Sequence, residues 1–365
     1  MDLLEQARAV ISEVDDEMAR LFVRRMRAVE MVAEHKRAHG LPVLDEAREA
    51  QVISRGAGRV EDDVLRAYYV NFIRNNMQLS REYQHRLLSG MRVAYAGTEG
   101  AFAHIATGKL FPTAERVAFG DFVSAYRAVE AGTCDAAVRP VENSSNGDVG
   151  QVTDLMFSGS LYVNAMIDLA VTHDLLVVPG TQKEQIRTDI CHPQALGQCA
   201  EYIRKSGWEA REFANTALAA KEVAGNADPS VAAIASEEAA AIFGLEVLDR
   251  NVNASRNNTT RFAVFSRSEH LQDKGGSNPH FILVFTVKNE AGALARAIDV
   301  IGQHGFNMQN LRSRPMKELL WQYYFYVEAE GNVHTDKGRA MLEDLKGFCD
   351  RLKVVGSYRM AEVAK

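Results

Sequence analysis

The sequence lacks the features that mark secreted, membrane or nucleic-acid-binding proteins. Its first residues carry no basic segment followed by an apolar one, so no secretory signal is visible. The longest strongly apolar run, residues 281–287, is far shorter than a membrane span. The net charge is −6 and no long basic run occurs, which argues against nucleic acid as a partner. We therefore expect a cytoplasmic protein that binds neither a membrane nor nucleic acid.

The cysteine and glycine patterns argue against two further kinds of site. The chain has four cysteines and no C-x-x-C pair, so we expect reduced thiols and no metal site. The turn with Gly97 and Gly100 lacks the third glycine of a dinucleotide fingerprint, and no cofactor is expected. The 365 residues are 47% apolar and 25% charged, which is typical of a soluble globular protein with two or three domains.

The first 39 residues contain neither glycine nor proline, which predicts one helix of about 35 residues, roughly 50 Å long. Along one face, in steps of three and four, the apolar pattern is interrupted by Asp15 and by three cations, Arg8, Arg25 and Lys36. An unpaired cation on a buried face is costly, so these residues indicate an anionic ligand. Arg8 and Lys36 could instead extend to solvent near the helix ends, but Arg25 lies in mid-helix.

Arg25 and Lys36 are eleven residues apart, close to three turns, so they share a face about 16 Å apart along the axis. Both long side chains can converge on one small dianion. Arg8 lies about 25 Å from Arg25 and cannot easily reach the same pocket. It would have to serve a second copy of the chain, which predicts an intertwined dimer or a higher homo-oligomer.

Two further helices are predicted in residues 1–90, each after an aspartate suited to be its N-cap. The helix after Asp45 brings Arg48 and Glu49 together in its first turn. On the other helix, Ser80 and Gln84 are four residues apart and therefore lie on one face. We expect an all-helical domain.

Residues 91–270 contain strand-like runs followed by polar clusters, which predicts an α/β unit with ligands at the ends of its strands. The clusters are Glu142-Asn143-Ser144, Cys191-His192-Pro193-Gln194, Asn215-Thr216 and Asn257-Asn258-Thr259-Thr260-Arg261-Phe262. Each cluster alone is explained by a turn, a helix entry or a cap. The order of segments predicts two lobes, residues 91–170 with 249–268 and residues 171–248, with the site in the cleft between them.

Residues 273–279 have the composition of a linker. The segment after it, residues 279–365, shows strand-like and helical patterns in the order βαββαβ, which predicts a small α+β domain.

Together these features resemble the bifunctional chorismate mutase–prephenate dehydratases over nearly the whole chain. Residues 1–90 are similar to the all-helical chorismate mutases in the order and approximate spacing of eight residues: Arg8, Arg25, Lys36, Asp45, Arg48, Glu49, Ser80 and Gln84. For the last pair, Asn76 with Ser80 is a competing alignment. The resemblance implies that the arginines hold the carboxylates of chorismate, Lys36 and Gln84 bond its ether oxygen, and Glu49 holds the ring hydroxyl.

Residues 91–270 are similar to the prephenate dehydratases, whose two-lobed α/β domain is like that of periplasmic binding proteins. The motifs G-x-x-G-x-F, E-N-S, H-P-Q and T-R-F occur in the family's order. The resemblance implies that Thr260 assists the leaving hydroxyl and that Arg261 neutralises a carboxylate of prephenate. The other implied substrate ligands are Asn143, Ser144, Cys191 and Gln198. Two positions depart from the family: Ala103 replaces a serine or threonine, and Cys191 replaces a serine.

The C-terminal segment looks like an ACT domain, a module that binds amino acids. The matching effector motifs supply Gly292, Ala293, Leu294, Ser313 and Arg314. Arg312 stands where the family usually has glutamate. The resemblance implies feedback inhibition by L-phenylalanine, and the alternative is a dimerisation module without a ligand.

Two other functions compete with this interpretation. The departures at Ala103 and Cys191 would suit a chorismate mutase fused to a two-lobed ligand sensor without catalytic activity. An arogenate dehydratase is the second alternative, because arogenate and prephenate are closely related substrates that the sequence does not separate.

Overall fold

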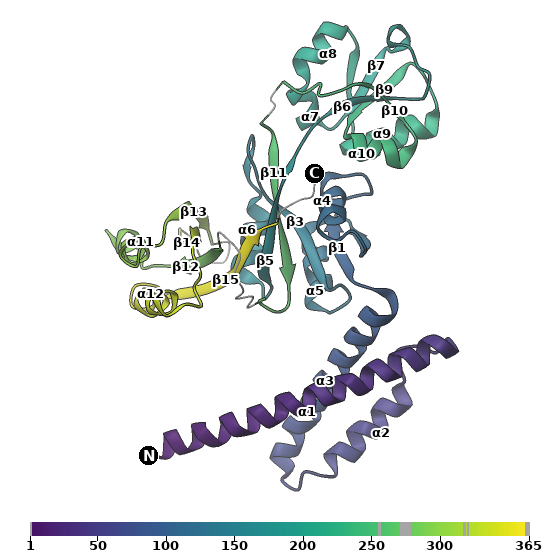
Figure 1. Cartoon of the computed structure of the whole chain (residues 1–365). Coiled ribbons are helices and arrows are strands. Elements are labelled where there is room, and N and C mark those ends of the chain that lie inside the picture. Colours follow the sequence, from purple (N-terminus) through teal and green to yellow (C-terminus); the bar gives the residue numbers. More distant parts are fainter. Residues whose placement is uncertain (1, 255–256, 271–278, 317–318, 320, 362–365) are drawn as a thin grey trace. The chain divides into compact units, whose positions relative to one another are not determined.

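The structure is a computed structural model that describes residues 2–254, 257–270, 279–316, 319 and 321–361. It forms two compact units, Met1–Arg92 and Val93–Lys365. Most of their helices and strands are labelled in Figure 1. None of the described helices has an apolar stretch long enough to span a bilayer. The same residues hold no group of three or more side chains placed to bind a metal ion.

The first unit consists of three helices, α1 (Leu3–His39), α2 (Glu46–Ala57) and α3 (Asp63–Ser89). Each begins after an aspartate whose carboxylate accepts hydrogen bonds from amides of the first turn: Asp2, Asp45 and Asp62. The end of α1 is set by Gly40, whose φ of 64° is the left-handed conformation that favours glycine. The long N-terminal helix and the two later helices are therefore present as predicted.

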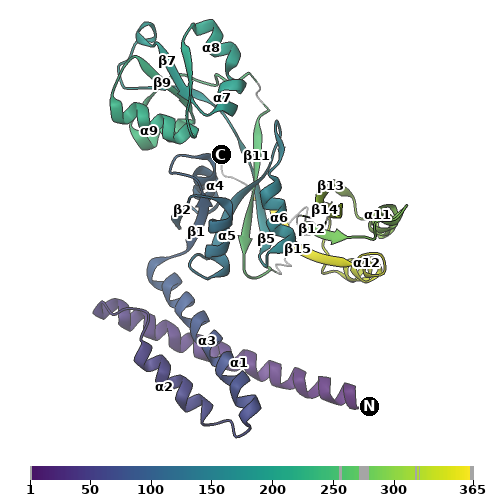
Figure 2. The same cartoon turned by 180° about the vertical axis from the view of Figure 1, so that it is seen from behind.

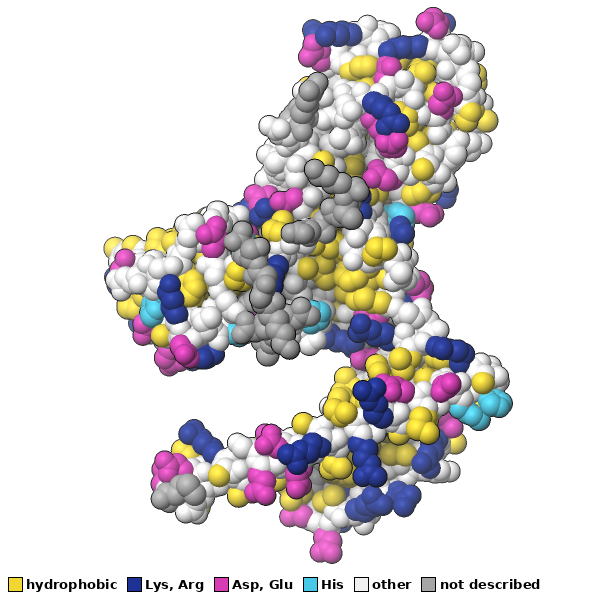
Figure 3. Space-filling view, in the orientation of Figure 1, with side chains coloured by type: hydrophobic (Ala, Val, Ile, Leu, Met, Phe, Trp, Pro, Cys, Tyr) yellow, Lys and Arg dark blue, Asp and Glu magenta, His cyan; other side chains and the backbone are white. Residues whose placement is uncertain are grey.

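The other two helices cover only part of α1. Helix α3 contacts both α1 and α2, but Val29 and Ala33 are the buried residues of α1. Large apolar side chains that α1 exposes are Leu3, Leu4, Val10, Ile11, Val14, Met18, Leu21, Phe22, Val23, Met31 and Val32. Figure 3 shows hydrophobic side chains interspersed with Lys and Arg over this unit. Helix α1 therefore presents a large exposed apolar surface.

The second unit contains two β-sheets. In the larger one, residues of the first lobe form the strand order β5-β11-β3-β1-β2. These strands are β1 (Arg92–Ala96), β2 (Glu115–Phe119), β3 (Ala136–Asn143), β5 (Tyr162–Ala170) and β11 (Thr259–Ser266), and β4 (Gly147–Asp148) pairs with the end of β3. The helices that pack on them are α4 (Phe102–Leu110), α5 (Phe122–Glu130) and α6 (Gly150–Ser158).

The second lobe has a sheet of its own with the order β10-β6-β9-β7-β8. Its strands are β6 (Asp174–Val177), β7 (Thr188–Cys191), β8 (Glu209–Glu212), β9 (Val231–Ala235) and β10 (Glu246–Asp249). Its helices are α7 (Pro193–Gln198), α8 (Ala200–Ser206), α9 (Thr216–Asn226) and α10 (Glu237–Phe243). The chain enters this lobe after β5 and leaves it before β11, and both views show its elements gathered around their own sheet (Figures 1 and 2).

Residues 279–361, here called the C-terminal module, follow the predicted βαββαβ order. The elements are β12 (His280–Thr286), α11 (Ala293–Gln303), β13 (Met308–Pro315), β14 (Tyr323–Glu330), α12 (Asp336–Lys346) and β15 (Arg351–Met360). Their strands pair in the order β13-β14-β12-β15. One face of this sheet packs under α11 and α12 with Phe281, Leu283 and Phe285. The other face, with Ile282 and Val284, joins the core of the first lobe.

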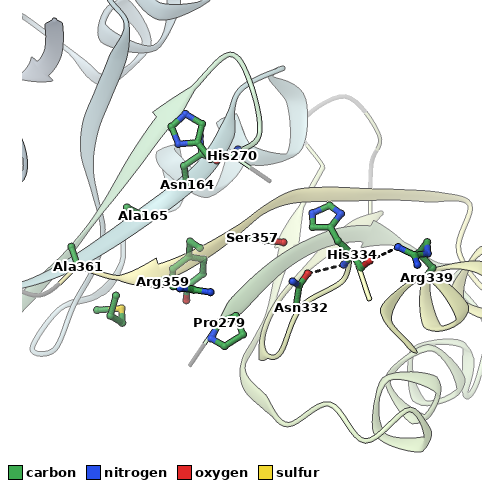
Figure 4. A pocket seen from close by; sticks show the side chains of 12 residues that line it. Asn164, Ala165, His270, Pro279, Asn332, His334, Arg339, Ser357, Arg359 and Ala361 are labelled. Carbon is green, nitrogen blue, oxygen red and sulfur yellow. Dashed lines mark hydrogen bonds between the residues drawn. The ribbon is translucent and has the colours of Figure 1, made fainter. Parts of the chain in front are cut away.

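The module is attached to the first lobe at several points. Strand β15 pairs in parallel with β5 through Arg359 and Met360. The Lys353 ammonium donates hydrogen bonds to the carbonyls of Met156, at 2.8 Å, and Gly159, at 2.5 Å, at the end of α6. Burial there lowers the pKa of Lys353 to about 8. A cavity of about 500 Å³ lies beside this junction, between β5, β15 and the start of α12 (Figure 4). None of the predicted site residues lines it.

Candidate active sites

The helical unit encloses a cavity of about 380 Å³ between its three helices. The polar side chains that line it are Arg25, Lys36, Asp45, Arg48, Glu49, Ser80, Arg81 and Gln84. Seven of the eight residues predicted for this site are thus brought together, and four cations against two carboxylates leave two positive charges. This balance suits a small dianion.

Two of the cations are held by hydrogen bonds that orient them. Arg25 donates to the hydroxyl of Ser80 and, at 3.4 Å, to the carbonyl of Asn76, and burial lowers its pKa. The Lys36 ammonium donates to the carbonyl of Val43, in the segment between α1 and α2. The predicted convergence of Arg25 and Lys36 on one cavity is therefore observed.

The two alignments of the third helix share Ser80 and differ in whether Gln84 or Asn76 belongs to the site. Ser80 and Gln84 line the cavity, whereas Asn76 does not. The side-chain amide of Gln84 donates to the carbonyl of Ser80 at 3.3 Å, and its buried oxygen has no partner among the described residues. A buried polar atom without a partner is costly unless a ligand pairs with it. Gln84 is therefore poised for a polar ligand.

Arg81 is a cavity residue that the sequence analysis missed. Its guanidinium forms an ion pair with Glu49, which was expected to contact the substrate hydroxyl directly. Asp45 also has a structural partner, because its carboxylate accepts the first-turn amide of Arg48 at 2.9 Å. The position of Arg81 between Ser80 and Gln84 is the only sequence signal that could have indicated it.

Arg8 is exposed and does not line this cavity. It lies 17 residues before Arg25 on the uninterrupted helix α1, or about 25 Å along the axis. This separation agrees with the one predicted from the sequence.

In the second unit, side chains from several polar clusters form one hydrogen-bond chain. The side-chain amide of Asn143 donates to the hydroxyl oxygen of Thr260 at 2.9 Å and to the side-chain oxygen of Asn258 at 2.9 Å. Thr260 and Asn258 are nearly buried, at 9% and 4% exposure. Since Asn143 donates to the oxygen of Thr260, the hydroxyl proton of Thr260 stays free for another acceptor.

The chain of bonds continues into the second lobe. Asn258 donates to the side-chain oxygen of Gln198, at the end of α7, at 3.1 Å. The same oxygen lies 3.0 Å from Nε2 of His173. Since Gln198 accepts there, His173 carries its proton on Nε2. Burial lowers the pKa of His173, and its Nδ1 has no partner among the described residues.

His173 is a second site residue that the sequence analysis missed. It is 3% exposed and lies directly before β6, where the chain crosses between the lobes. Its ring packs edge-on against Phe102 at 5.9 Å between centroids. The available sequence signal for this site residue was a polar side chain shortly before a continuous apolar run.

The turn before α4 lies against the second lobe. A Cβ at Gly100 would lie 3.2 Å from Phe243 and 3.4 Å from Ala217, and φ is +82° there, so glycine is required. The hydroxyl of Thr98, in the same turn, is buried without a partner among the described residues. Ala103, the departure from the family, is buried in the first turn of α4.

Ser144 and Asn143 also stabilise the loop around the site. The Ser144 hydroxyl donates to the carbonyl of Asn257 at 2.7 Å and accepts the amide of Thr259 at 2.9 Å. The side-chain oxygen of Asn143 accepts the amides of Ser145 and Asn146, at 3.0 and 3.1 Å. The turn interpretation of Asn143 is confirmed, and its contact with substrate stays a prediction.

Cys191 is not at the cleft, which corrects the prediction that it binds substrate. It is fully buried among apolar side chains of the second lobe. Its thiol donates to the carbonyl of Ile234 at 2.9 Å, and burial raises its pKa. The thiol replaces a serine hydroxyl inside the lobe, where a small apolar side chain with a weak donor is well accommodated.

Arg261 is the second correction. Adjacent residues of a strand point to opposite faces, and Arg261 lies on the face opposite to Thr260. There it forms a bidentate ion pair with Asp168, at 2.8 and 2.9 Å, and contacts Glu328 of the C-terminal module at 3.4 Å. Its guanidinium is occupied by protein carboxylates and does not face the cleft.

Among the described residues, the two predicted effector motifs lie in different surroundings. Leu294, which follows Gly292 and Ala293, lines a cavity of about 500 Å³ with Trp321, Tyr323 and Phe325. Ser313 is exposed on β13, the edge strand. Arg314 instead faces α6 and lies 3.2 Å from Asp154. Within one chain Arg314 is thus engaged by carboxylates of the first lobe, and its role as an effector ligand stays a prediction.

The folds and sites define a class of protein in which an all-helical unit with a cationic cavity precedes a two-lobed α/β unit with a polar site between its lobes. Comparisons with known proteins agree. Residues 7–85 match the family model of chorismate mutase type II, and residues 93–270 match that of prephenate dehydratase.

The chain is 30% identical to the bifunctional chorismate mutase/prephenate dehydratase of Enterobacter agglomerans, over 95% of this chain and 94% of the relative. It is 34% identical to the arogenate dehydratase/prephenate dehydratase 2 of Arabidopsis thaliana, over 74% and 73%. The chain belongs to the family of bifunctional chorismate mutase/prephenate dehydratases.

Two solved structures are similar to the second unit. The prephenate dehydratase of Arthrobacter aurescens in complex with L-Phe has a TM-score of 0.68 at 26% identity, covering 75% of this chain and 93% of that one. A protein described as a quorum quenching acylase has a TM-score of 0.69 at 28% identity, with coverages of 74% and 98%.

Proposed function

We propose that the chain catalyses two successive reactions, the rearrangement of chorismate to prephenate and the conversion of prephenate to phenylpyruvate. The observation that carries the second step is the hydrogen bond from Asn143 to Thr260, which leaves the hydroxyl proton of the nearly buried Thr260 available. In this proposal residues 1–90 are the mutase domain, residues 91–270 are the dehydratase domain, and residues 279–365 are the regulatory module.

The mutase step is a unimolecular rearrangement, so no general acid or base is needed. Catalysis requires a fixed diaxial conformer and stabilisation of the charge that develops on the ether oxygen. We assign the carboxylates of chorismate to Arg25 and Arg48, and the ether oxygen to Lys36 and Gln84. Arg81 holds the carboxylate of Glu49 in place for the ring hydroxyl.

The dehydratase step expels the ring hydroxide and carbon dioxide from prephenate. Aromatisation drives the reaction, so a weak acid such as the Thr260 hydroxyl is sufficient for the leaving group. Because Arg261 faces away, the substrate carboxylates must be bound by other groups. We assign a part of this role to the buried hydroxyl of Thr98, which has no partner among the described residues and also offsets the hydroxyl that Ala103 lacks.

An acylase function, by analogy with the similar solved structure, has less support. Acyl transfer by a hydroxyl needs a general base beside it. The hydrogen-bond partner of the Thr260 hydroxyl is an amide, that of Asn143, and within the described residues His173 is connected to it only through Gln198 and two asparagines. This arrangement favours the dehydratase.

One assay separates the dehydratase from a sensor without catalytic activity. Purified protein incubated with prephenate should yield phenylpyruvate, measured as the enolate absorbance in alkali. Absence of product would support the sensor. A second assay compares the turnover of arogenate with that of prephenate and decides between the two dehydratase substrates. This comparison is needed because one relative is named for both activities.

We further propose that the C-terminal module is an ACT domain and that L-phenylalanine inhibits the dehydratase through it, in a homodimer or higher oligomer. The related structure binds L-Phe, and Leu294 here opens on a cavity with aromatic walls. A second copy that packs on the exposed apolar face of α1 would also bring its Arg8 to the mutase cavity.

Calorimetry tests the effector. Binding of phenylalanine must weaken prephenate binding by the same factor by which prephenate weakens phenylalanine binding. The corresponding coupling free energy is commonly about 1–3 kcal/mol. Titration of phenylalanine with and without prephenate should show this reciprocity. If phenylalanine gives neither heat nor thermal stabilisation, the module only supports oligomerisation.

A further inference from the structure

The catalytic pair is followed, one step along the same two strands, by a pair of charged residues. Thr260 on β11 is opposite Asn143 on β3, and the next pair is Arg261 opposite Glu142. Since side chains alternate across a strand, the first pair lies on the cleft face and the second on the face toward the C-terminal module.

Both residues of the charged pair bond to the C-terminal module. Glu142 forms an ion pair with Arg312 of β13. Arg261 lies 3.4 Å from Glu328 of β14, in addition to its ion pair with Asp168. The module thus contacts β3 and β11 at the residues next to Asn143 and Thr260, whose side chains form the 2.9 Å hydrogen bond on the other face of the sheet.

The end of β3 is a place where a side-chain contact can change the backbone. Opposite Arg261 and Phe262, the register shifts between Glu142 and Pro140, so that Val141 is an extra residue in β3. Such a bulge disrupts the ladder locally and re-aims the side chains that follow it. Glu142 and Asn143 come directly after this bulge, where they pair with β11 on one side and with β4 on the other. The contact of Glu142 with Arg312 adds a connection from the C-terminal module to this segment.

Arg312 itself is well held. Its Nε donates to the side-chain oxygen of Asn310 at 3.1 Å, and its guanidinium lies 6.0 Å from the ring of Tyr326. Arg312 immediately precedes Ser313 on β13. A glutamate at this position would repel Glu142. The contact between Arg312 and Glu142 therefore depends on the positive charge of Arg312.

From these contacts we propose that Glu142 and Arg312 are positioning residues of the dehydratase, whose ion pair holds Asn143 in place to orient the Thr260 hydroxyl. This rests on the proposed dehydratase function. In this proposal a change in the position of β13, the strand that contains Ser313, alters the position of Asn143 and so couples the C-terminal module to the dehydratase site.

A charge exchange tests the pair. Glu142→Arg and Arg312→Glu each place like charges together, and each should lower kcat for prephenate by at least about tenfold, with KM nearly unchanged. The double variant restores the opposite charges and should recover kcat to within about threefold of the wild type. Mutase activity in the same chains should stay unchanged. Arg339→Glu is the matched control, because Arg339 pairs with Asp336 inside the module.

Hydrogen exchange supplies a readout that does not need dehydratase activity. In both single variants, amides of residues 141–146 and 257–261 should exchange faster than in the wild type, and the double variant should restore protection. If the wild-type protein forms no phenylpyruvate from prephenate, the proposed dehydratase function is wrong. Hydrogen exchange would then still show whether the ion pair of Glu142 and Arg312 holds Asn143 in place. Single variants with wild-type exchange and kcat, or a double variant no better than the singles, would overturn it.

Discussion

Thr260 and Arg261 are consecutive residues of β11 whose side chains lie on opposite faces of the sheet. The hydroxyl of Thr260 accepts a hydrogen bond from Asn143 in the cleft, whereas Arg261 pairs with Asp168 on the other face. A three-letter motif therefore combines a catalytic position with a structural one. The carboxylate contacts also raise the pKa of Arg261, so it remains charged at any physiological pH.

Thr260→Val should abolish most dehydratase activity without unfolding the protein. The substitution keeps the volume and β-branching but removes the only proton that this residue can give, so kcat should fall by about 10²–10⁴-fold. Thr259→Val, one residue earlier on the same strand, is the matched control and should retain activity. Phenylpyruvate formation and thermal melting report the two effects. A Thr260→Val protein with wild-type kcat would exclude Thr260 as the acid.

The sequence was sufficient where a signal is local. The absence of glycine and proline before Gly40 predicts α1, and aspartate N-caps predict the starts of α2 and α3. The 3.6-residue period places Arg25 and Lys36 on one face, and the cavity contains both.

The sequence was insufficient where the third dimension decides. Period-two alternation puts Arg261 on the opposite face from Thr260, but only the packing of the C-terminal module shows that this face holds carboxylates. Cys191 ends β7, yet its side chain turns into the core of the lobe. His173 and Arg81 contact their site partners Gln198 and Glu49 across large separations in sequence, so the weak local signal at each position did not identify those partners.

Lys36→Met should reduce mutase activity and leave dehydratase activity intact. Loss of a hydrogen-bond donor to developing negative charge costs about 10²–10³-fold in rate, by analogy with an oxyanion donor. The neighbouring Arg37→Met is the control, because Arg37 bonds the carbonyl of Leu87 outside the cavity and should be tolerated. Separate assays with chorismate and prephenate measure the two activities. Equal losses in both would contradict the division of the chain near residue 90.

Arg8 should act in the mutase site of a second copy. Arg8→Ala and Lys36→Ala proteins should each be inactive as mutases, because each lacks a cation of the complete site. Mixed and allowed to exchange subunits, they form hybrid dimers in which one of two sites has both residues, so about a quarter of wild-type activity should return. Exchange is verified by mass spectrometry of differently tagged chains. Exchange without recovery would show that Arg8 is structural.

Asp189 should make the second lobe less stable at neutral pH than at acid pH. It is fully buried in β7, its carboxylate oxygens have no partner among the described residues, and burial raises its pKa from 3.8 to about 7. Between these two values the folded state keeps a proton that the unfolded state releases. Stability therefore falls as the pH rises from about 4 to about 7, and it changes no further above that.

Asp189→Asn removes this titration while it keeps the shape of the protonated acid. The variant should melt several degrees above the wild type at pH 8, since the shift corresponds to roughly 4 kcal/mol at most, and the gain should disappear near pH 4. Asp228→Asn is the control in the same lobe, because hydrogen bonds from Ser230 lower the pKa of Asp228, and its loss should not stabilise the protein at pH 8. Melting by circular dichroism across this range measures both variants. An Asp189→Asn protein no more stable than the wild type at pH 8 would mean that Asp189 is ionised and compensated in the folded state.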